Sequence, residues 1–261
     1  MADRLIDRVA AVTAEAAQYA LSRFRTEVTN WEKAPGELVC EVDLGVDAML
    51  RQRLSALVPE AGWLSEETAD DLKRLAHRQL WVVDPIDGTR DYLRGREGWA
   101  VSVALVADGR PVLGVLDAPA RQEQWRAEAG FGAYRNGARV RAGDRQELAG
   151  ARVPADALAK ADRGFFVLAP KPNSIALRMA MVAAGEADLV ATLRWGNEWD
   201  IAAAALIAEE AGASVTDAIG RPLVFNTPQA RAFGVLTTTR GIHMAAVERL
   251  APRVAAAVAK D

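Results

Sequence analysis

The run Leu80-Trp-Val-Val-Asp-Pro-Ile-Asp-Gly-Thr89 changes from apolar residues to a polar turn within a short distance. Its first four residues carry no polar side chain, which is typical of a strand buried on both faces of a sheet. Pro85 has a fixed φ and no N–H to donate, so we expect it to end this strand directly after Asp84. Asp87 follows one turn of chain later, so both carboxylates can face one point.

Gly88 and Thr89 are expected to begin a helix, whose free N–H groups and dipole favour an anion. Two carboxylates held close together at a strand end repel each other and raise each other's pKa unless a cation lies between them. Mg²⁺ prefers oxygen ligands and is commonly held by one or two carboxylates together with phosphate oxygens. The pattern therefore suits phosphoryl chemistry. The residues alone leave a second interpretation open, in which Asp84 and Asp87 are a turn residue and a helix cap.

Elements on both sides of this run predict a mixed α and β protein. Before residue 140 the periodicity favours helices and strands with an Asp108-Gly109 hairpin, and after residue 150 helices and strands alternate. Three further acidic positions fall where a strand or loop gives way to a helix or turn: Asp43, which can cap the following helix, Glu66-Glu67 and Asp200. The expected helices are 1–26, 44–57, 174–184, 200–211 and 242–260, and the expected strands are 38–42, 63–64, 80–83, 99–107, 112–116, 187–192, 215–216 and 233–237.

The stretch Arg139–Gly150 is polar and contains glycine, which indicates a boundary between two tightly packed halves. We place an N-terminal α+β half at residues 1–145 and a C-terminal α/β half at residues 146–261. Three of the four acidic positions fall in the first half, and Asp200 falls in the second.

Composition excludes several classes of protein. The chain has 261 residues, of which 51% are hydrophobic, and its 32 basic and 35 acidic side chains give a formal charge of −3. This charge makes a broad electrostatic surface for a nucleic acid polymer unexpected. No apolar run approaches the ~20 residues that span a bilayer, and charges interrupt the N-terminal stretch where a signal peptide would be apolar. The single Cys40 allows no intrachain disulfide. We expect a soluble cytoplasmic protein without membrane association.

Four motifs in this order resemble the inositol monophosphatase superfamily, a group of lithium-sensitive, Mg²⁺-dependent phosphatases. They are Leu64-Ser-Glu-Glu-Thr68, Trp81-Val-Val-Asp-Pro-Ile-Asp-Gly-Thr89, Glu198-Trp-Asp-Ile-Ala-Ala203 and Glu210-Ala-Gly212. The resemblance extends over essentially the whole chain. It implies a layered α-β-α-β-α sandwich, in agreement with the mixed α+β and α/β pattern of the two halves.

The resemblance also implies the residues of a metal site, with two or three Mg²⁺ ions and inhibition by Li⁺. One ion would be held by Glu66, Asp84 and the carbonyl of Ile86, and a second by Asp84, Asp87 and Asp200. Thr89, hydrogen-bonded to Asp43, would orient the attacking water together with Glu66. The backbone N–H groups of Gly88 and Thr89 would hold phosphate oxygens, and Lys33 corresponds to a loop lysine near the metals.

The resemblance leaves several substrates open. Inositol-specific members carry a glutamate several residues before the Trp-Asp pair, where counting back from Asp200 gives Leu193. The sequence Arg90-Asp-Tyr92 and the motif Glu-Trp-Asp are similar to the 3'(2'),5'-bisphosphate nucleotidase branch. A second phosphate would need further cations, for which the candidates are Arg178 and Arg194, with Lys171 and Arg90 behind them.

We therefore expect a phosphomonoesterase that acts on a small phosphorylated molecule, first of all 3'-phosphoadenosine 5'-phosphate, to give AMP and phosphate. The alternatives are a phosphatase for inositol 1-phosphate or for a broader set including fructose 1,6-bisphosphate and histidinol phosphate. A further alternative is a non-catalytic regulator that binds RNA or a partner. It is disfavoured because Glu66, Asp84, Asp87, Thr89 and Asp200 are all intact. The expected state is a monomer or homodimer.

Overall fold

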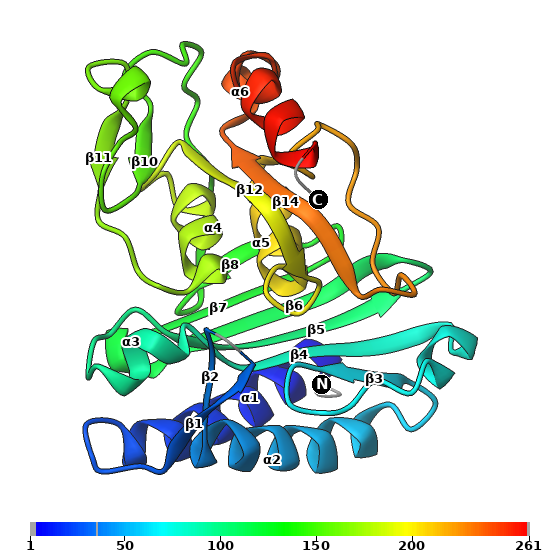
Figure 1. Cartoon of the computed structure of the whole chain (residues 1–261). Helices are drawn as coiled ribbons and strands as arrows, with labels where there is room; N and C mark the ends of the chain where they lie inside the picture. The colour runs from blue at the N-terminus through cyan, green and yellow to red at the C-terminus, as the bar shows by residue number, and fades with distance from the viewer. Residues whose placement is uncertain (1–3, 35, 260–261) are drawn as a thin grey trace.

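Five layers of alternating helix and sheet make up the computed structural model, which describes residues 4–34 and 36–259 (Figure 1). Helices α1 (Leu5–Arg23) and α2 (Glu41–Leu57) form the first layer, and a seven-stranded sheet the second. Helices α4 (Ile175–Ala183) and α5 (Ala202–Glu210) form the third. A three-stranded sheet and helix α6 (His243–Val258) complete the order. The predicted α-β-α-β-α sandwich is confirmed.

The large sheet follows the chain in simple order, and only its first two strands are parallel. Asp108 and Gly109 form the hairpin turn between the third and fourth strands as predicted, both with positive φ, which is the conformation that a tight hairpin turn favours. The strands are β3 (Gly62–Ser65), β4 (Gln79–Asp87), β5 (Ala100–Ala107), β6 (Arg110–Ala118), β7 (Glu123–Glu128), β8 (Gly132–Arg135) and β9 (Ala138–Val140).

Strand β4 does not end at Pro85, and this part of the prediction is wrong. The strand runs on to Asp87, with a bulge between Asp84, which lies opposite Ser102, and Asp87, which lies opposite Ala100. A bulge tolerates proline because its extra residue stands outside the hydrogen-bond ladder. Gly88 has a φ of 98°, and a Cβ there would come within 2.7 Å of the Gly98 carbonyl oxygen. Glycine therefore allows the short helix α3 (Thr89–Leu93) to begin directly after the strand.

The smaller sheet has the order β12-β14-β13 and is antiparallel throughout. Its strands are β12 (Leu189–Asn197), β13 (Ser214–Thr216) and β14 (Arg231–Thr238). Strand β12 extends beyond the predicted 187–192 and carries a bulge between Thr192 and Trp195. Helix α5 begins at Ala202 after the cap residue Ile201, so Asp200 lies in the turn before the helix and neither begins nor caps it. A further pair, β10 (Arg152–Pro154) and β11 (Val167–Ala169), is parallel.

Lys33 lies in a strand and not in the predicted loop. Strands β1 (Asn30–Ala34) and β2 (Glu37–Cys40) form an antiparallel hairpin, and α2 begins directly after it, with Cys40 as its cap residue. Asp43 therefore lies inside the first turn of α2 and not before it. Its carboxylate accepts a hydrogen bond of 2.8 Å from the Cys40 N–H, which closes a capping box from within the helix.

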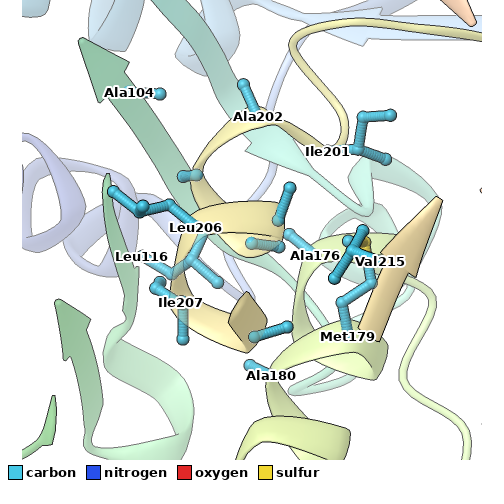
Figure 2. Packing of buried hydrophobic residues seen from close by; sticks show 14 of the residues in the cluster. Ala104, Leu116, Ala176, Met179, Ala180, Ile201, Ala202, Leu206, Ile207 and Val215 are labelled. Atoms are coloured by element: carbon cyan, nitrogen blue, oxygen red, sulfur yellow. The ribbon is translucent and has the colours of Figure 1, made fainter. Parts of the chain in front are cut away.

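Two apolar layers cover the two faces of the large sheet, as the alternation along β4 requires. Trp81 and Val83 pack against α1 and α2, whereas Leu80 and Val82 belong to the cluster formed with α4 and α5. Helix α5 lies between two sheets, and its residues 202–208 are all buried (Figure 2). Gly114, which has no side chain, lets α5 approach β6 closely, since a Cβ there would lie 2.8 Å from the Ala203 carbonyl oxygen.

The proposed division at residue 145 falls after β9 and before the elements of the smaller sheet. The apolar cluster around α4 and α5 contains residues from both sides of that position. The division into two halves stays a prediction. Within residues 4–34 and 36–259, no helix combines the length and the apolar composition that crossing a membrane requires.

Candidate active site

A cavity of about 750 Å³ opens where the ends of β4 and β12 meet the N-termini of α3, α4 and α5. Most of the site residues predicted from the sequence line it, although they are spread over the chain. Lys33 and Asp43 do not contribute to the lining, although Lys33 contacts the lining residue Glu66. The predicted residues that line the cavity are Glu66, Asp84, Ile86, Asp87, Gly88, Thr89, Arg178, Arg194 and Asp200.

Four carboxylates of the cavity lie close enough to oppose each other's ionisation. Burial raises the pKa of Asp84 well above its usual range, and the nearby charges of Glu66, Asp87 and Asp200 raise it further. Asp84 is 1% exposed, and its carboxylate accepts a hydrogen bond from the Ile86 N–H at 3.0 Å. Burial and the charges of Asp87 and Glu66 raise the pKa of Asp200 to about 8. This cluster holds more negative charge than its protein neighbours offset.

Asp87 is fixed by the N-terminus of α4, which the sequence did not reveal. Its carboxylate accepts hydrogen bonds from the Ser174 hydroxyl and from the N–H groups of Ile175 (3.3 Å) and Ala176 (2.8 Å). Burial nevertheless raises its pKa. The only signal in the sequence was Ser174 at the start of a predicted helix, where it acts as the N-cap by accepting from the Leu177 N–H. The contact joins β4 to α4 at the cavity.

Lys33 reaches the cluster from the β1–β2 hairpin. Its Nζ lies 2.7 Å from Glu67 Oε1 and 3.4 Å from Glu66 Oε1. Burial raises the pKa of Glu66, and the charge of Lys33 opposes that rise. Glu67 was part of the quoted motif without a predicted role, and it is the nearer partner of the lysine. The hairpin is thereby held beside the cavity by an ion pair.

The hydrogen bond expected between Thr89 and Asp43 is wrong. The Thr89 hydroxyl donates to the Ile86 carbonyl oxygen at 3.0 Å, because both belong to the tight turn that joins β4 to α3. Asp43 instead accepts from Cys40. Burial raises the pKa of Asp43 to about 6, and the charge of Glu67 adds to this rise. Thr89 remains at the cavity, next to a carbonyl that the resemblance implies as a metal ligand.

A group of cations lines another part of the cavity. Arg178 donates to the carbonyl oxygens of Ser174 (3.3 Å) and Asn173 (3.2 Å). Its pKa is lowered by burial and by the charge of nearby Arg194, whereas the charge of Asp87 opposes this decrease. Within the described chain, neither Arg178 nor Arg194 forms an ion pair with a carboxylate. Two neighbouring guanidinium groups without a carboxylate partner favour an anion from outside the chain. Arg90, Lys171 and Arg231, of which the sequence did not indicate the last, also line the cavity.

Leu193 lies where counting back from Asp200 placed the position of the inositol-binding glutamate. It packs against the apolar cluster beneath α6, while Thr192 and Arg194 line the cavity. The bulge between Thr192 and Trp195 changes which side chains of β12 face the cavity, so a count without gaps does not identify the facing residue. The side chain that reaches the cavity next to position 193 is an arginine.

The donor set fits a hard cation, although the side chains are not gathered around a single point. Among the residues that the structure describes, no three His, Cys, Asp or Glu side chains are grouped closely enough to hold a metal ion as they stand. Glu66, Asp84, Asp87 and Asp200 nevertheless border one cavity and raise each other's pKa. Carboxylate oxygens are the ligands that Mg²⁺ prefers, and a divalent cation would offset this repulsion.

Comparison with known proteins places this chain among metabolite phosphatases. The model of the inositol monophosphatase family matches residues 2–260, so the chain belongs to this family. Fructose-1,6-bisphosphatase/inositol-1-monophosphatase of Thermotoga maritima is 34% identical over 74% of this chain and 77% of its own. The 3'(2'),5'-bisphosphate nucleotidase CysQ of Aggregatibacter actinomycetemcomitans is 30% identical over 85% and 87%. A solved inositol monophosphatase of Thermotoga maritima superposes with a TM-score of 0.79 at 27% identity and covers 96% of each chain.

Relatives of similar identity have different names, among them Inositol-1-monophosphatase, Nus factor SuhB and Histidinol-phosphatase. The chain is a phosphatase of the inositol monophosphatase family, which is generally Mg²⁺-dependent. Overall similarity does not select a substrate, and that choice has to be argued from the side chains around the cavity.

Proposed function

We propose that this phosphatase uses Mg²⁺ and hydrolyses 3'-phosphoadenosine 5'-phosphate to AMP and phosphate. The observation that carries the proposal is the composition of the cavity, which is lined by four mutually repelling carboxylates and by two guanidinium groups that form no ion pair with a carboxylate in the described chain. Such a site offers one region for metal ions with the reacting phosphate and another for a second anionic group.

The metal would be held by Glu66, Asp84, the Ile86 carbonyl, Asp87 and Asp200, and when bound it would lower the pKa of a water and neutralise the leaving oxygen. Glu66 borders the cavity with a raised pKa, so its carboxylate can accept a proton from the attacking water. The hydroxyl of Thr89 would help to orient that water. Backbone N–H groups of Gly88 and Thr89 would hold the phosphate oxygens.

Arg178 and Arg194 would bind the second phosphate. Arg178 is held on the first turn of α4 by backbone carbonyls, so its guanidinium group is positioned before a ligand arrives. The similarity to CysQ over most of both chains agrees with a doubly phosphorylated nucleotide. The second candidate is a phosphatase for sugar phosphates, which the similarity to the Thermotoga maritima protein favours. Fructose 1,6-bisphosphate would also present two phosphates to this cavity.

Phosphate release tests both parts of the proposal. The substrates are 3'-phosphoadenosine 5'-phosphate, inositol 1-phosphate, fructose 1,6-bisphosphate and histidinol phosphate, each with Mg²⁺ alone and with added Li⁺. We expect the adenosine bisphosphate to give the highest kcat/KM and Li⁺ to inhibit. A clear preference for inositol 1-phosphate would contradict the nucleotidase assignment while leaving the phosphatase intact.

The variant Asp84→Asn tests the carboxylate cluster, and Asp188→Asn is its matched control. Asp188 is also a buried aspartate, but its oxygens accept from the Arg152 side chain and backbone N–H. We expect Asp84→Asn to lose activity by orders of magnitude without a loss of thermal stability, because the substitution removes a repelling charge. Asp188→Asn should lose stability and keep its activity per folded molecule. Undiminished hydrolysis by Asp84→Asn would overturn the metal assignment.

A further inference from the structure

A second cavity of about 390 Å³ adjoins the first. Trp195, Arg231 and Ala232 line both cavities, so the two meet at the end of β12 and β14. The loop 217–224, Phe233 and Val258 of α6 complete the second cavity. A ligand that occupies the carboxylate site would reach the second cavity by passing Trp195.

The chemistry of the second cavity differs from that of the first. Ile219, Pro222, Leu223 and Val224 supply apolar side chains. The carboxylate of Asp217 already accepts hydrogen bonds from the N–H groups of Ile219 and Arg221, both at 2.8 Å, so it is committed to shaping the loop. The first cavity offers charge to a phosphate, and the second, which Arg221 and Arg231 also line, offers mostly apolar surface to an uncharged group.

Trp195 stands between the two cavities as a supported aromatic surface. Its ring is 45% exposed and meets the buried Phe233 edge to face, with ring centroids 5.5 Å apart. The guanidinium carbon of Arg231 lies 5.9 Å from the Trp195 ring centroid. A rigid indole ring beside a planar guanidinium group is the type of surface on which nucleic acid bases stack. The substrate part that fits here is flat, aromatic and uncharged.

We propose that the second cavity binds an aromatic heterocycle of the substrate, such as a nucleobase, which stacks on Trp195 beside Arg231. This inference rests on the proposed function, since it takes the reacting phosphate to lie among the carboxylates. It goes further by assigning the leaving group: a nucleoside fills both cavities, whereas inositol or fructose leaves the apolar one empty. Trp195 and Arg231 are then residues that determine specificity.

Kinetics of Trp195→Ala test the assignment with Trp195→Phe as the conservative variant. For 3'-phosphoadenosine 5'-phosphate we expect Trp195→Ala to raise KM tenfold or more with little change in kcat, and Trp195→Phe to restore most of the loss. For fructose 1,6-bisphosphate the same variant should leave KM within about twofold, because that substrate has no ring to stack. An equal rise in KM for both substrates would overturn the inference.

Direct binding keeps this test separate from the phosphatase activity. Adenosine carries no phosphate, so its binding, followed by calorimetry, reports on the second cavity alone. We expect the parent protein and the control Phe131→Ala, which removes another exposed aromatic ring, to bind adenosine, and Trp195→Ala to lose that binding. Adenosine binding that depends on Trp195 in a protein without phosphatase activity would support the inference and contradict the proposed function.

The opposite results overturn the inference. Hydrolysis of the adenosine bisphosphate that is indifferent to Trp195, without adenosine binding, would leave the proposed function standing alone. The apolar cavity could instead meet a second copy of this chain. A change of mass in solution for Val224→Glu, with substrate KM unchanged, would show that the cavity is an interface between copies and not a base site.

Discussion

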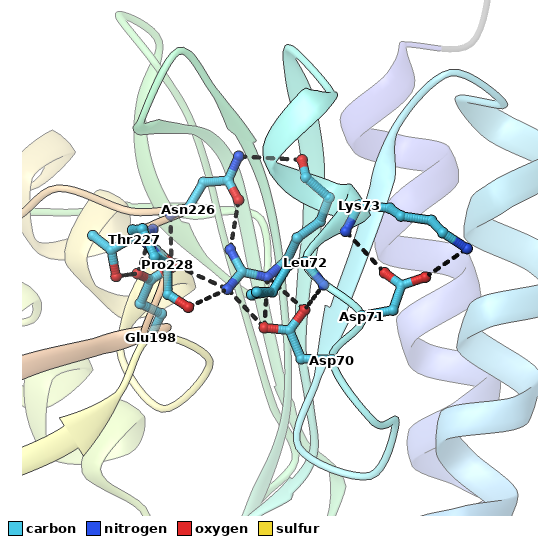
Figure 3. A network of polar contacts seen from close by, with 9 residues as sticks. Asp70, Asp71, Leu72, Lys73, Glu198, Asn226, Thr227 and Pro228 are labelled. Carbon is cyan, nitrogen blue, oxygen red and sulfur yellow. Dashed lines mark hydrogen bonds and ion pairs between the residues drawn. The ribbon is translucent and has the colours of Figure 1, made fainter.

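Two regions of the molecule bury several charges each. In one region the charged groups have partners within the chain, and in the other they lie next to charges of the same sign. In the first region, Arg74 is 2% exposed and joins two loops that are far apart in the chain. Figure 3 labels Asp70 in one of these loops and Asn226 in the other. Its guanidinium group donates to both Asp70 oxygens, to Asn226 Oδ1 and to the carbonyl oxygens of Thr227 and Pro228. Glu198, fully buried beside it, accepts from the N–H groups of Asn226 and Thr227 and from the Thr227 hydroxyl.

The second region is the cavity, where Asp84, Asp87, Asp200 and Glu66 face one another. Asp200 accepts only one hydrogen bond from the described chain, at 3.1 Å from the Asn197 N–H. Asp200 and Glu198 are two residues apart in one motif, yet one points into the cavity and the other into the Arg74 network. A buried charge that is hydrogen-bonded or paired within the chain stabilises the fold. A buried charge that lies next to like charges without a partner is expected to bind a ligand of opposite charge. The comparison separates the two roles within the Glu-Trp-Asp motif.

Substitution of Asp200 should have the largest effect. We expect Asp200→Asn to lower kcat by about a thousandfold, because a metal ligand and its charge are lost. Its thermal unfolding temperature should stay unchanged or rise, since repulsion from Asp87 and Glu66 is relieved. Phosphate release and calorimetry measure the two quantities. The matched variant Glu198→Gln should show the reverse, with lower stability and retained activity per folded molecule. If both variants changed activity and stability in the same way, the assignment of one region to catalysis and the other to stability would be wrong.

Removal of Arg74 should have the next largest effect, and this effect should be on the stability of the fold. Arg74→Ala leaves buried acceptors on Asn226, Thr227 and Pro228 without their donor, and we expect a loss of about 3–5 kcal/mol in the free energy of unfolding. Lysine cannot reproduce the paired contacts, so Arg74→Lys should recover little of this. Urea denaturation measures both. The control Asp70→Ala, whose side chain is more exposed, should cost less. Equal losses in the free energy of unfolding for Arg74→Ala and Asp70→Ala would show that the ion pair, and not the contacts between the two loops, provides the stability.

Short-range features of both regions could be predicted from the sequence, and the contacts that complete them could not. The apolar run Leu80–Val83 and the Asp108-Gly109 turn indicate a strand and a hairpin because each depends on neighbouring residues. Arg74 and Asn226 are 152 positions apart, and nothing local marks either as a partner of the other. The Ser174–Asp87 contact is hidden for the same reason.

The bulges show a second limit of the sequence. A single inserted residue in β4 carried the strand past Pro85, and another in β12 made the count that selected Leu193 misleading. Because side chains alternate along a strand, one extra residue changes which of them face a cavity. Motif identity therefore located the cavity, and the sequence also named Arg194 as a candidate, but the structure was needed to show which side chains of β12 line the cavity.

Metal addition should produce a smaller effect that is confined to one region. Mg²⁺ at about 100 times its dissociation constant should stabilise the protein by about 2.7 kcal/mol, because it binds the folded cavity and not the unfolded chain. Thermal unfolding with and without Mg²⁺ measures this. Asp84→Asn should lose the stabilisation, and Glu198→Gln should keep it, since the network has no free carboxylate to offer. A metal response that survives in Asp84→Asn would place the ion elsewhere.

His243 extends the comparison to a buried group satisfied without charge, and its effect should be the smallest. Its ring nitrogens lie 3.2 Å from Thr216 Oγ1 and 2.9 Å from Thr238 Oγ1, and burial lowers its pKa. With the folded pKa below the unfolded value of about 6.5, the unfolded chain takes up the proton first as the pH falls. His243 should therefore lower the stability between pH 7 and pH 5, whereas protonation of Asp43 and Asp200, whose pKa values burial raises, acts in the opposite direction. Relative to the parent, His243→Gln should become more stable as the pH falls through this range. The control His77→Gln removes the exposed histidine. Equal pH profiles for the parent and His243→Gln would contradict a contribution of His243 to the acid sensitivity.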